Sequence, residues 1–378
     1  MRIVHVEAGR HRYGGAAQAA SLVAGLERAG ARNVLVCAAG GALAAAGHDA
    51  LGGARVMPLP MGGDLDVRLV GRLRRAFAAL EPDVVHVHSR RGADLYAGLA
   101  CALDARPAVV TRRVDSREPA AWVRLKYRPY AAVVAISTAV ERDLRERVGI
   151  DAARLHRVPS GIDPGRFCAD AAAARERLAA AFALEADAFV VGVVAQLIGR
   201  KGHATLLAAL PGLVRRHPRL RVLCFGRGPL ARALAARIER AGLAQHVRLA
   251  GFADDLPDLV AGFDALVHPA EREGLGVAVL EAMSAGVPVV AAAAGGLVDV
   301  VEDGMSGLLF PPGDAAALGA ALGRLVEDPA LRARLGSRGR ERVARRFTVS
   351  AMVERYLDIY ERVLARPHAA RLPHGRPV

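Results

Sequence analysis

Short runs of apolar, largely β-branched residues alternate with longer segments of helical periodicity, and this alternation occurs twice along the chain. The first series predicts strands over residues 2–7, 33–38, 54–58, 83–88, 107–111, 132–136 and 155–158. The second series predicts strands over 188–195, 220–225, 246–250, 264–268, 287–292 and 307–310. Helices are expected between the strands, for example over 15–29, 66–80, 92–103 and 137–148. Strands that are apolar on both faces are typical of parallel sheets covered by helices on each side, so the sequence predicts an α/β protein with two doubly wound domains.

The boundary between the two domains is expected where prolines and glycines cluster, in the segment 158–167. A chain of 378 residues is long enough to form two separate cores. We therefore assign 1–165 to an N-terminal domain and 166–348 to a C-terminal domain. Apolar residues at helical spacing predict a last helix over 349–365, and 366–378 is expected to be a flexible tail.

The chain is basic, with a formal net charge of +14, but its arginines and lysines are spread over both halves. Aromatic residues make up only 4% of the chain, which is a poor supply for stacking on bases. These two features disfavour a nucleic-acid-binding protein, which stays as the last of the alternatives. A generally basic surface explains the charge, and attraction to an anionic membrane or glycolipid is the other interpretation.

The four cysteines lie far apart and form no Cys-x-x-Cys pattern; they are Cys37, Cys101, Cys168 and Cys224. This distribution disfavours a zinc site or a disulfide framework and fits a reducing compartment. No apolar segment approaches about 18 residues without a charge, so no membrane-spanning helix is predicted. We expect a cytoplasmic protein with no bound metal and no cofactor.

The first strand-to-helix loop places Gly14 and Gly15 where the first helix is predicted to begin. Open α/β sheets bind ligands beyond the carboxyl ends of their strands, where helix N-termini point. Glycines at such a place let a diphosphate approach the backbone N–H groups, although an ordinary turn explains them equally well.

The loop after the first strand of the second series carries two adjacent cations, Arg200 and Lys201. Lys201 is one of only two lysines in the chain, which indicates that a compact ammonium group is needed there. Two positive charges at the start of a helix are unfavourable beside its dipole, and a bound anion would offset them. The pair therefore predicts a phosphate site.

Glu273 and Glu281 are separated by seven residues, across a glycine-containing loop that leads into a helix. Gly274, Leu275 and Gly276 are expected to offer backbone donors to a phosphate. Glu281 lies among apolar residues, where a carboxylate needs hydrogen-bond donors, and sugar or ribose hydroxyls would supply them. The paired carboxylates of glycoside hydrolysis are an alternative, ranked lower because one acid lies on a helix of a nucleotide-type fold.

Five segments in this order resemble the GT-B glycosyltransferases of family 4, the group with the E-x7-E signature. They are PDVVHVHS (82–89), VPSGID (158–163), QLIGRKG (196–202), EGLGVAVLEAMSAGVPVVA (273–291) and GLLFPPGD (307–314). The resemblance covers residues 1–362 and is most specific in the C-terminal half. It implies two Rossmann-like domains facing across a cleft, with the last helix crossing back onto the first domain.

The resemblance also implies an activity. The second domain would hold a nucleotide-sugar donor and the first would bind the acceptor, a saccharide or lipid-linked glycan of the cell-envelope or lipopolysaccharide type. Transfer would retain the anomeric configuration and need no metal. A nucleotide-sugar 2-epimerase of the same fold is the alternative within this resemblance.

The resemblance assigns roles to individual residues. Gly14 and Gly15 would lie near the donor diphosphate, Lys201 on its phosphates, Glu273 on the donor sugar and Glu281 on the ribose. Arg200 and Lys201, with the backbone donors at 274–276, would stabilise the leaving phosphate.

Two positions depart from the family pattern. The usual arginine five residues before Lys201 is Gln196 here, and Arg200 is the candidate replacement. The usual histidine after the fifth N-domain strand is matched by Arg113. An arginine cannot act as a general base, but it can steady a leaving phosphate or bind an anionic acceptor.

The segment 112–130 combines six basic and two acidic residues with Trp122, the only tryptophan. Aromatic rings among cations suit an anionic membrane surface or a phosphorylated lipid-linked acceptor. The other interpretation is a helix packed on the sheet with its arginines in water. Membrane association predicts weaker vesicle binding when four cations are neutralised: Arg117, Arg124, Lys126 and Arg128.

Overall fold

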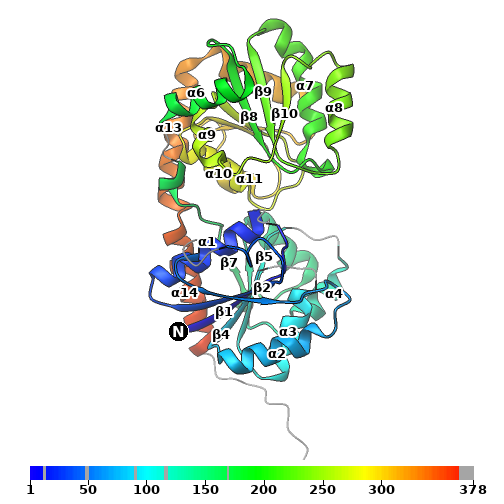
Figure 1. Cartoon of the computed structure of the whole chain (residues 1–378), viewed down its shortest axis with the longest axis vertical. Coiled ribbons are helices and arrows are strands. Elements are labelled where there is room, and N and C mark those ends of the chain that lie inside the picture. Colours follow the sequence, from blue (N-terminus) through cyan, green and yellow to red (C-terminus); the bar gives the residue numbers. More distant parts are fainter. Residues whose placement is uncertain (12–13, 47–50, 89–91, 115–117, 168–169, 366–378) are drawn as a thin grey trace, which may run out of the picture. The chain divides into compact units, whose positions relative to one another are not determined.

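The computed structural model describes residues 1–11, 14–46, 51–88, 92–114, 118–167 and 170–365 (Figure 1). It divides the chain into two compact units, Met1–Gly161 with Val349–Val378, and Ile162–Thr348. The division falls four residues before the expected boundary at 165, because the Ile162 N–H donates to the Phe347 carbonyl at 2.8 Å and so joins the second unit. The expected tail, 366–378, lies outside the described residues.

The first unit is built on a parallel seven-stranded sheet in the order β3-β2-β1-β4-β5-β6-β7. Its strands are β1 (Arg2–Glu7), β2 (Arg32–Ala38), β3 (Arg55–Leu59), β4 (Val84–Val87), β5 (Ala108–Arg112), β6 (Ala132–Ala135) and β7 (Leu155–Arg157). All seven expected strands are confirmed, each within one residue at either end. The direction of winding reverses between β1 and β4, which is where such sheets bind ligands.

Helices cover both faces of this sheet, as the apolar strands predict. They are α1 (Gly14–Arg28), α2 (Leu69–Leu80), α3 (Ala93–Leu103), α4 (Ala120–Tyr127), α5 (Thr138–Arg142) and α14 (Val349–Ala365). One core joins α1 and α14 to side chains such as Ile3 and Val84, and the other joins α2, α3 and α4 to side chains such as Val4 and Val85. The helix expected over 137–148 continues α5 with wider, π-helical turns over Asp143–Val148.

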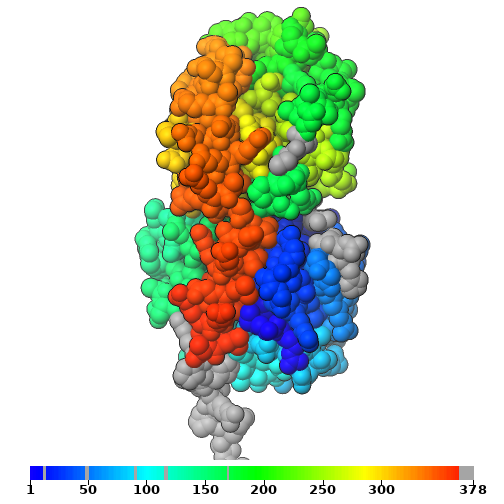
Figure 2. All heavy atoms as spheres, turned by 90° about the vertical axis from the view of Figure 1, so that its left-hand side faces the viewer, coloured from blue at the N-terminus to red at the C-terminus, as the bar shows by residue number. Residues whose placement is uncertain are grey.

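The last helix, α14, packs on α1 and the first sheet, with Met352, Tyr356 and Tyr360 among its buried residues. Figure 2 shows α14, in red, beside α1, in blue. Gly25 of α1 permits this close approach, because a Cβ atom there would stand 2.6 Å from Val353 Cγ2.

The second unit is built on a parallel six-stranded sheet in the order β10-β9-β8-β11-β12-β13. Its strands are β8 (Phe189–Val194), β9 (Leu220–Phe225), β10 (Val247–Gly251), β11 (Ala265–His268), β12 (Val289–Ala292) and β13 (Leu308–Phe310). Its helices are α6 (Ala171–Phe182), α7 (His203–Arg216), α8 (Ala231–Arg240), α9 (Leu256–Leu259), α10 (Val277–Ser284), α11 (Leu297–Val300), α12 (Ala315–Glu327) and α13 (Pro329–Arg346). The predicted strands are confirmed here too, and the winding reverses between β8 and β11. Both units are thus doubly wound α/β sheets.

Two smaller expectations can be checked within the described residues. Cys37, Cys101 and Cys224 are buried and free, while Cys168 lies outside the described residues. None of the described helices has the length and apolar composition required to cross a membrane.

Candidate functional site

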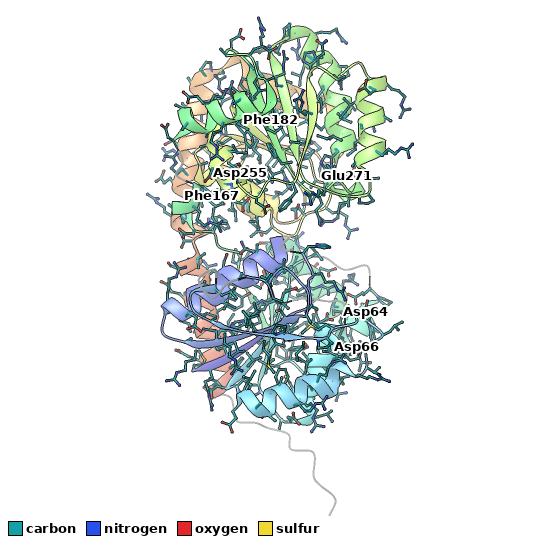
Figure 3. All side chains as sticks on the ribbon, viewed as in Figure 1. Asp64, Asp66, Phe167, Phe182, Asp255 and Glu271 are labelled. Atoms are coloured by element: carbon teal, nitrogen blue, oxygen red, sulfur yellow. The ribbon has the colours of Figure 1, made fainter. Side chains whose placement is uncertain are left out.

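The loops that follow β8 and β11 meet at the carboxyl edge of the second sheet. The Glu271 N–H donates to the Arg200 carbonyl at 3.0 Å, which joins the two loops by their backbones. Glu271 is labelled in Figure 3. Gly202 makes the contact possible, because its φ is +70° and a Cβ atom there would stand 1.8 Å from the Pro269 carbonyl oxygen.

This edge gathers an acid and its partners around the Glu273 carboxylate. Lys201 Nζ is paired with Glu273 Oε2, and His268 Nε2 lies 2.8 Å from the same oxygen. The Gly274 N–H donates to Oε1 at 3.1 Å, and Arg200 Nη1 stands 4.0 Å from that atom. Arg200 also donates to the Arg272 carbonyl at 3.0 Å. The structure therefore brings together Lys201, Arg200 and Glu273, three of the residues that the sequence singled out.

Burial and ion pairing act in opposite directions on the pKa values at this edge. Burial raises the pKa of Glu273, but the His268 hydrogen bond and the Lys201 charge outweigh it and hold that pKa well below its usual range. Burial lowers the pKa of Lys201, and the Glu273 charge opposes this effect. Burial also lowers the pKa of His268. A neutral His268 then donates Nε2–H to Glu273.

The two cations expected at the start of a helix lie just before it. Arg200 and Lys201 lie on a 3-10 turn, Gly199–Lys201, and α7 begins only at His203. Glu273 pairs with Lys201, while Arg200 Nη1 lies 4.0 Å from the same carboxylate group.

His203, which the sequence reading did not single out, lies beside this cluster with both ring nitrogens buried and without a partner among the described residues. Burial lowers its pKa to about 4, with smaller effects from His268 and Lys201. No local pattern signals such a residue, because its surroundings come from β11 as well as from α7.

Glu281 lies one turn inside α10 and is partly buried. Within the described part of the chain, its carboxylate accepts no hydrogen bond. Burial raises its pKa to about 7, and the charge of Arg166 opposes this effect. The carboxylate that the sequence predicted to need donors is therefore present without a protein donor among the described residues.

The loop before α10 positions the expected backbone donors. Gly274, Leu275 and Gly276 are buried, and the Gly274 N–H is already used by Glu273. Gly276 has a φ of +97°, and a Cβ atom there would stand 2.5 Å from Leu297 Cδ2. The N–H groups of Leu275 and Gly276 meet no acceptor in the described ranges, so they remain available at the helix N-terminus.

The first unit brings together Gly15 and Arg113, which the sequence predicted separately. α1 begins at Gly14, and a Cβ atom on Gly15 would lie 3.4 Å from Arg113 Cδ. Burial lowers the pKa of Arg113, against the charges of Tyr356 and Glu7. An arginine stays protonated in proteins, so a cation lies beside the N-terminus of α1.

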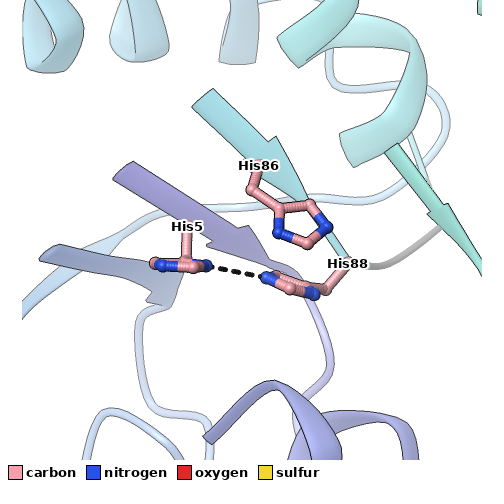
Figure 4. Close-up of side chains that lie close together, drawn as sticks. All are labelled: His5, His86 and His88. Carbon is pink, nitrogen blue, oxygen red and sulfur yellow. Dashed lines mark hydrogen bonds between the residues drawn. The ribbon is translucent and has the colours of Figure 1, made fainter. Parts of the chain in front are cut away.

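Three buried histidines, His5, His86 and His88, form a group that the sequence analysis missed (Figure 4). Their possible ligand atoms lie within 4.8 Å of one another, which is the spacing of a candidate metal site. The available signal was positional: His5 and His86 are paired in register on β1 and β4, and His88 follows two residues later. Each ring nitrogen already has a hydrogen-bond partner, so the group fits a polar network better than a vacant metal site.

Two cations of the basic segment 112–130 are internal. Lys126 is buried, with Nζ 2.8 Å from Asp94 Oδ2 and 2.7 Å from Glu118 Oε1. Arg112 is also buried and lies 3.1 Å from Glu118 Oε2. The expectation that Lys126 faces a membrane is therefore wrong, because α4 turns it into an ion-paired core.

The outer side of α4 is different. Trp122 is 42% exposed and Leu125 is 60% exposed, while Val123 packs inward. Arg124 and Arg128 are exposed beside them. Arg117, the remaining cation of the predicted membrane-binding set, lies outside the described residues.

Two family models match the chain. The model described as glycosyl transferases group 1 matches residues 174–342, and the model described as Glycosyltransferase Family 4 matches 13–166. A phosphatidyl-myo-inositol mannosyltransferase of Mycolicibacterium smegmatis is 31% identical over 82% of this chain and 80% of its own length.

A D-inositol 3-phosphate glycosyltransferase of Salinispora tropica is 35% identical over 64% of this chain. The match spans 52% of that relative, about half its length. Among solved structures, Anabaena HepE in complex with UDP and glucose has a TM-score of 0.86, covers 96% of this chain and 100% of its own, and is 22% identical. At that identity the likeness concerns the fold.

Proposed function

This chain belongs to the group 1 glycosyltransferases of the GT-B type, and we propose that it transfers a sugar from a nucleotide-sugar donor to a saccharide or lipid-linked acceptor of the cell envelope. The observation that carries the proposal is the cluster of Lys201, Arg200 and Glu273 at the carboxyl edge of the second sheet, with Glu281 on α10. It combines cations for phosphate with acids for hydroxyl groups.

Donor binding is proposed to exchange partners within this cluster. Lys201 is held by Glu273 in the free protein, and a diphosphate would draw the ammonium group toward its own oxygens. His268 remains bonded to Glu273 and keeps the carboxylate oriented, so its oxygens can accept hydrogen bonds from the donor sugar. The hydroxyls of the ribose would then supply the donors that Glu281 lacks.

The proposed reaction retains the anomeric configuration. The bond between the anomeric carbon and the β-phosphate oxygen breaks, and the acceptor oxygen bonds to the same face of that carbon. The acceptor proton passes to the leaving phosphate. Lys201, Arg200 and the free N–H groups of Leu275 and Gly276 would stabilise the charge on that phosphate.

We also propose that no metal is required. Two cationic side chains and a helix N-terminus supply the positive potential that a divalent ion supplies in other phosphate-transfer sites. Within the first unit, Arg113 and the backbone at Gly14 and Gly15 form a separate place that would suit an anionic group.

A cytoplasmic enzyme that binds the membrane peripherally through the outer side of α4 is the proposed setting. Trp122 and Leu125 offer exposed apolar surface, and Arg124 and Arg128 offer charge for anionic lipid. The mannosyltransferase relative is named for phosphatidyl-myo-inositol, a lipid acceptor, and this supports the setting.

Thermal unfolding with UDP, GDP or ADP tests the donor site, since a ligand that binds only the folded protein raises Tm. We expect one of these nucleoside diphosphates to raise Tm. The enzyme should release the same diphosphate from the corresponding nucleotide sugar faster when acceptor is added. Failure of all three to bind would refute the proposed donor site. Conversion of the nucleotide sugar without any acceptor would favour the 2-epimerase, which gains no support from relatives named as transferases.

A further inference from the structure

A continuous chain of hydrogen bonds crosses the core of the first unit from Arg113 to Glu27. Arg113 Nη2 lies 3.4 Å from His88 Nδ1, and His88 Nε2 lies 2.9 Å from His5 Nδ1. His5 Nε2 lies 2.9 Å from Asn33 Oδ1, and the Asn33 amide nitrogen lies 3.1 Å from Glu27 Oε1. Figure 4 shows the central link between the two imidazoles. A cation and a carboxylate therefore stand at opposite ends of one polar path.

The chemistry of its members gives this path a single direction. A guanidinium group only donates, so His88 Nδ1 must accept and the proton of a neutral His88 must be on Nε2. His88 then donates to His5 Nδ1, which places the His5 proton on Nε2, toward Asn33 Oδ1. The Asn33 amide group donates in turn to Glu27 and, at 3.0 Å, to the Ala31 carbonyl.

Burial keeps both imidazoles neutral, as this direction requires. Burial lowers the pKa of His5 to about 4, and the Asn33 hydrogen bond opposes this only in part. Burial lowers the pKa of His88 well below its usual value, and the charges of His86, His5 and Arg113 lower it further.

His86 fixes the same ring from another side. The His86 and His88 ring centroids are 3.9 Å apart. His86 is itself held by Thr111 Oγ1 at 2.7 Å and by the Tyr360 hydroxyl at 2.6 Å. His88 is thus bonded at both nitrogens and packed on one face, and a metal ion would have to displace several of these bonds.

The Arg113 end of the path lies at the N-terminus of α1, a position that favours anionic ligands. Arg113 packs beneath Gly15 at the start of the 15-residue helix α1, where backbone N–H groups are free of helical partners. Its Nε is buried and has no partner among the described residues. The orientation of the guanidinium therefore depends on what Nη2 contacts.

We propose that His88 and His5 are positioning residues for Arg113. Through fixed tautomers, they hold the guanidinium group beside the N-terminus of α1, where it meets an anionic group of the substrates. This role rests on the proposed transferase function. The assignment of the two tautomers is independent of that function.

The first test is independent of activity. Nitrogen-15 NMR of the histidine-labelled full chain should find the His5 and His88 protons on Nε2, with His88→Leu and His5→Leu as assignment controls. In Arg113→Ala, the His88 Nδ1 resonance should shift because its donor is gone. Protonation on Nδ1 of either ring, or Zn²⁺ displacing both resonances at equimolar concentration, would overturn the proposal.

The second test is a double-mutant cycle on transfer. His88→Leu should lower kcat by on the order of tenfold to a hundredfold in the wild-type background. It should have little further effect in the Arg113→Ala background, because a positioning residue acts through the group it positions. Equal losses in both backgrounds would show a merely structural role and overturn the proposal.

His5→Leu gives a second cycle if His88→Leu unfolds, and thermal unfolding monitors all variants. If the wild-type chain transfers no sugar at all, the proposed function fails, and the tautomer measurement still decides whether the path exists.

Discussion

Replacing Glu281 by Gln should stabilise the protein in a pH-dependent way while weakening donor binding. Burial raises the pKa of this carboxyl from its ordinary 4.5 to about 7. The folded protein therefore keeps a proton that the unfolded chain releases between those two pH values. Stability falls as the pH rises through this window and stays low above it. A glutamine has no proton to lose and escapes this penalty.

The size of the effect follows from the two pKa values. A pKa raised from 4.5 to about 7 corresponds to about 3 kcal/mol of unfavourable ionisation above pH 7. This is an upper bound, because Glu281 is only partly buried and Arg166 lies nearby. For a unit of this size it corresponds to roughly 6–12 °C in Tm. Near pH 4.5 the two proteins should melt within about 1 °C of each other.

The assay compares Glu281→Gln with wild type at pH 4.5, 6 and 8 by thermal unfolding. Glu239→Gln, an exposed glutamate on α8, is the matched control and should show no such trend. Calorimetry at pH 8 should show the cognate nucleoside diphosphate binding about tenfold more weakly to Glu281→Gln, because a charged acceptor is replaced by a neutral one. A Glu281→Gln protein that melts no higher than wild type at pH 8 would refute the reasoning, since it would mean that the folded protein already satisfies this carboxylate.

Three further predictions concern the proposed activity. Lys201→Ala should lower kcat/KM by on the order of a hundredfold to a thousandfold. It should also lower Tm, because Glu273 loses its buried partner. Near-wild-type kcat/KM with the true donor would contradict the proposed site. Addition of EDTA should leave the transfer rate unchanged, and strict dependence on added Mg²⁺ or Mn²⁺ would contradict the proposed mechanism. Co-sedimentation with anionic vesicles at low salt should weaken in a triple variant that combines Trp122→Ala, Arg124→Ala and Arg128→Ala. The control, Arg240→Ala on α8, should co-sediment like wild type. Equal recovery of the wild-type protein in the supernatant with and without anionic lipid would argue against membrane binding.

Much of the fold was predictable from local pattern alone. Short, mainly apolar runs such as 132–136 and 220–225 predict strands that are covered by helices on both faces of a parallel sheet. The structure has them as β6 and β9. The helices between them follow from apolar residues at helical spacing. Prolines and glycines cluster over 158–167, and the two compact units divide within that segment, between Gly161 and Ile162.

The loops that carry the candidate site were predictable for a related reason. In a parallel sheet every strand ends at the same edge, so polar residues that follow a strand gather there whatever the strand order. Lys201 and Glu273 each follow a strand, which is why both were selected from the sequence.

Other features depended on tertiary structure because they join positions far apart in the chain. Lys201 pairs with Glu273 across 72 residues because β8 lies next to β11, and strand order is not written in any local pattern. The same pairing places a carboxylate beside Lys201, which the sequence analysis did not predict. His5 meets His88 across 83 residues for the same reason, through the neighbours β1 and β4.

Burial is the other quantity that only the folded chain decides. Lys126 looks in sequence like a solvent-facing cation, yet α4 turns it onto Asp94 and Glu118. Burial in the folded protein raises the pKa of Glu281 to about 7, and the residue type alone does not reveal this shift. The amino-acid sequence determined the strands, the helices and the edge at which the site forms, because these follow from short-range patterns of apolar and polar residues. Which side chains pair, and how their proton affinities shift, was decided by the tertiary structure, because both depend on neighbours and on a loss of water that exist only after the sheets have formed.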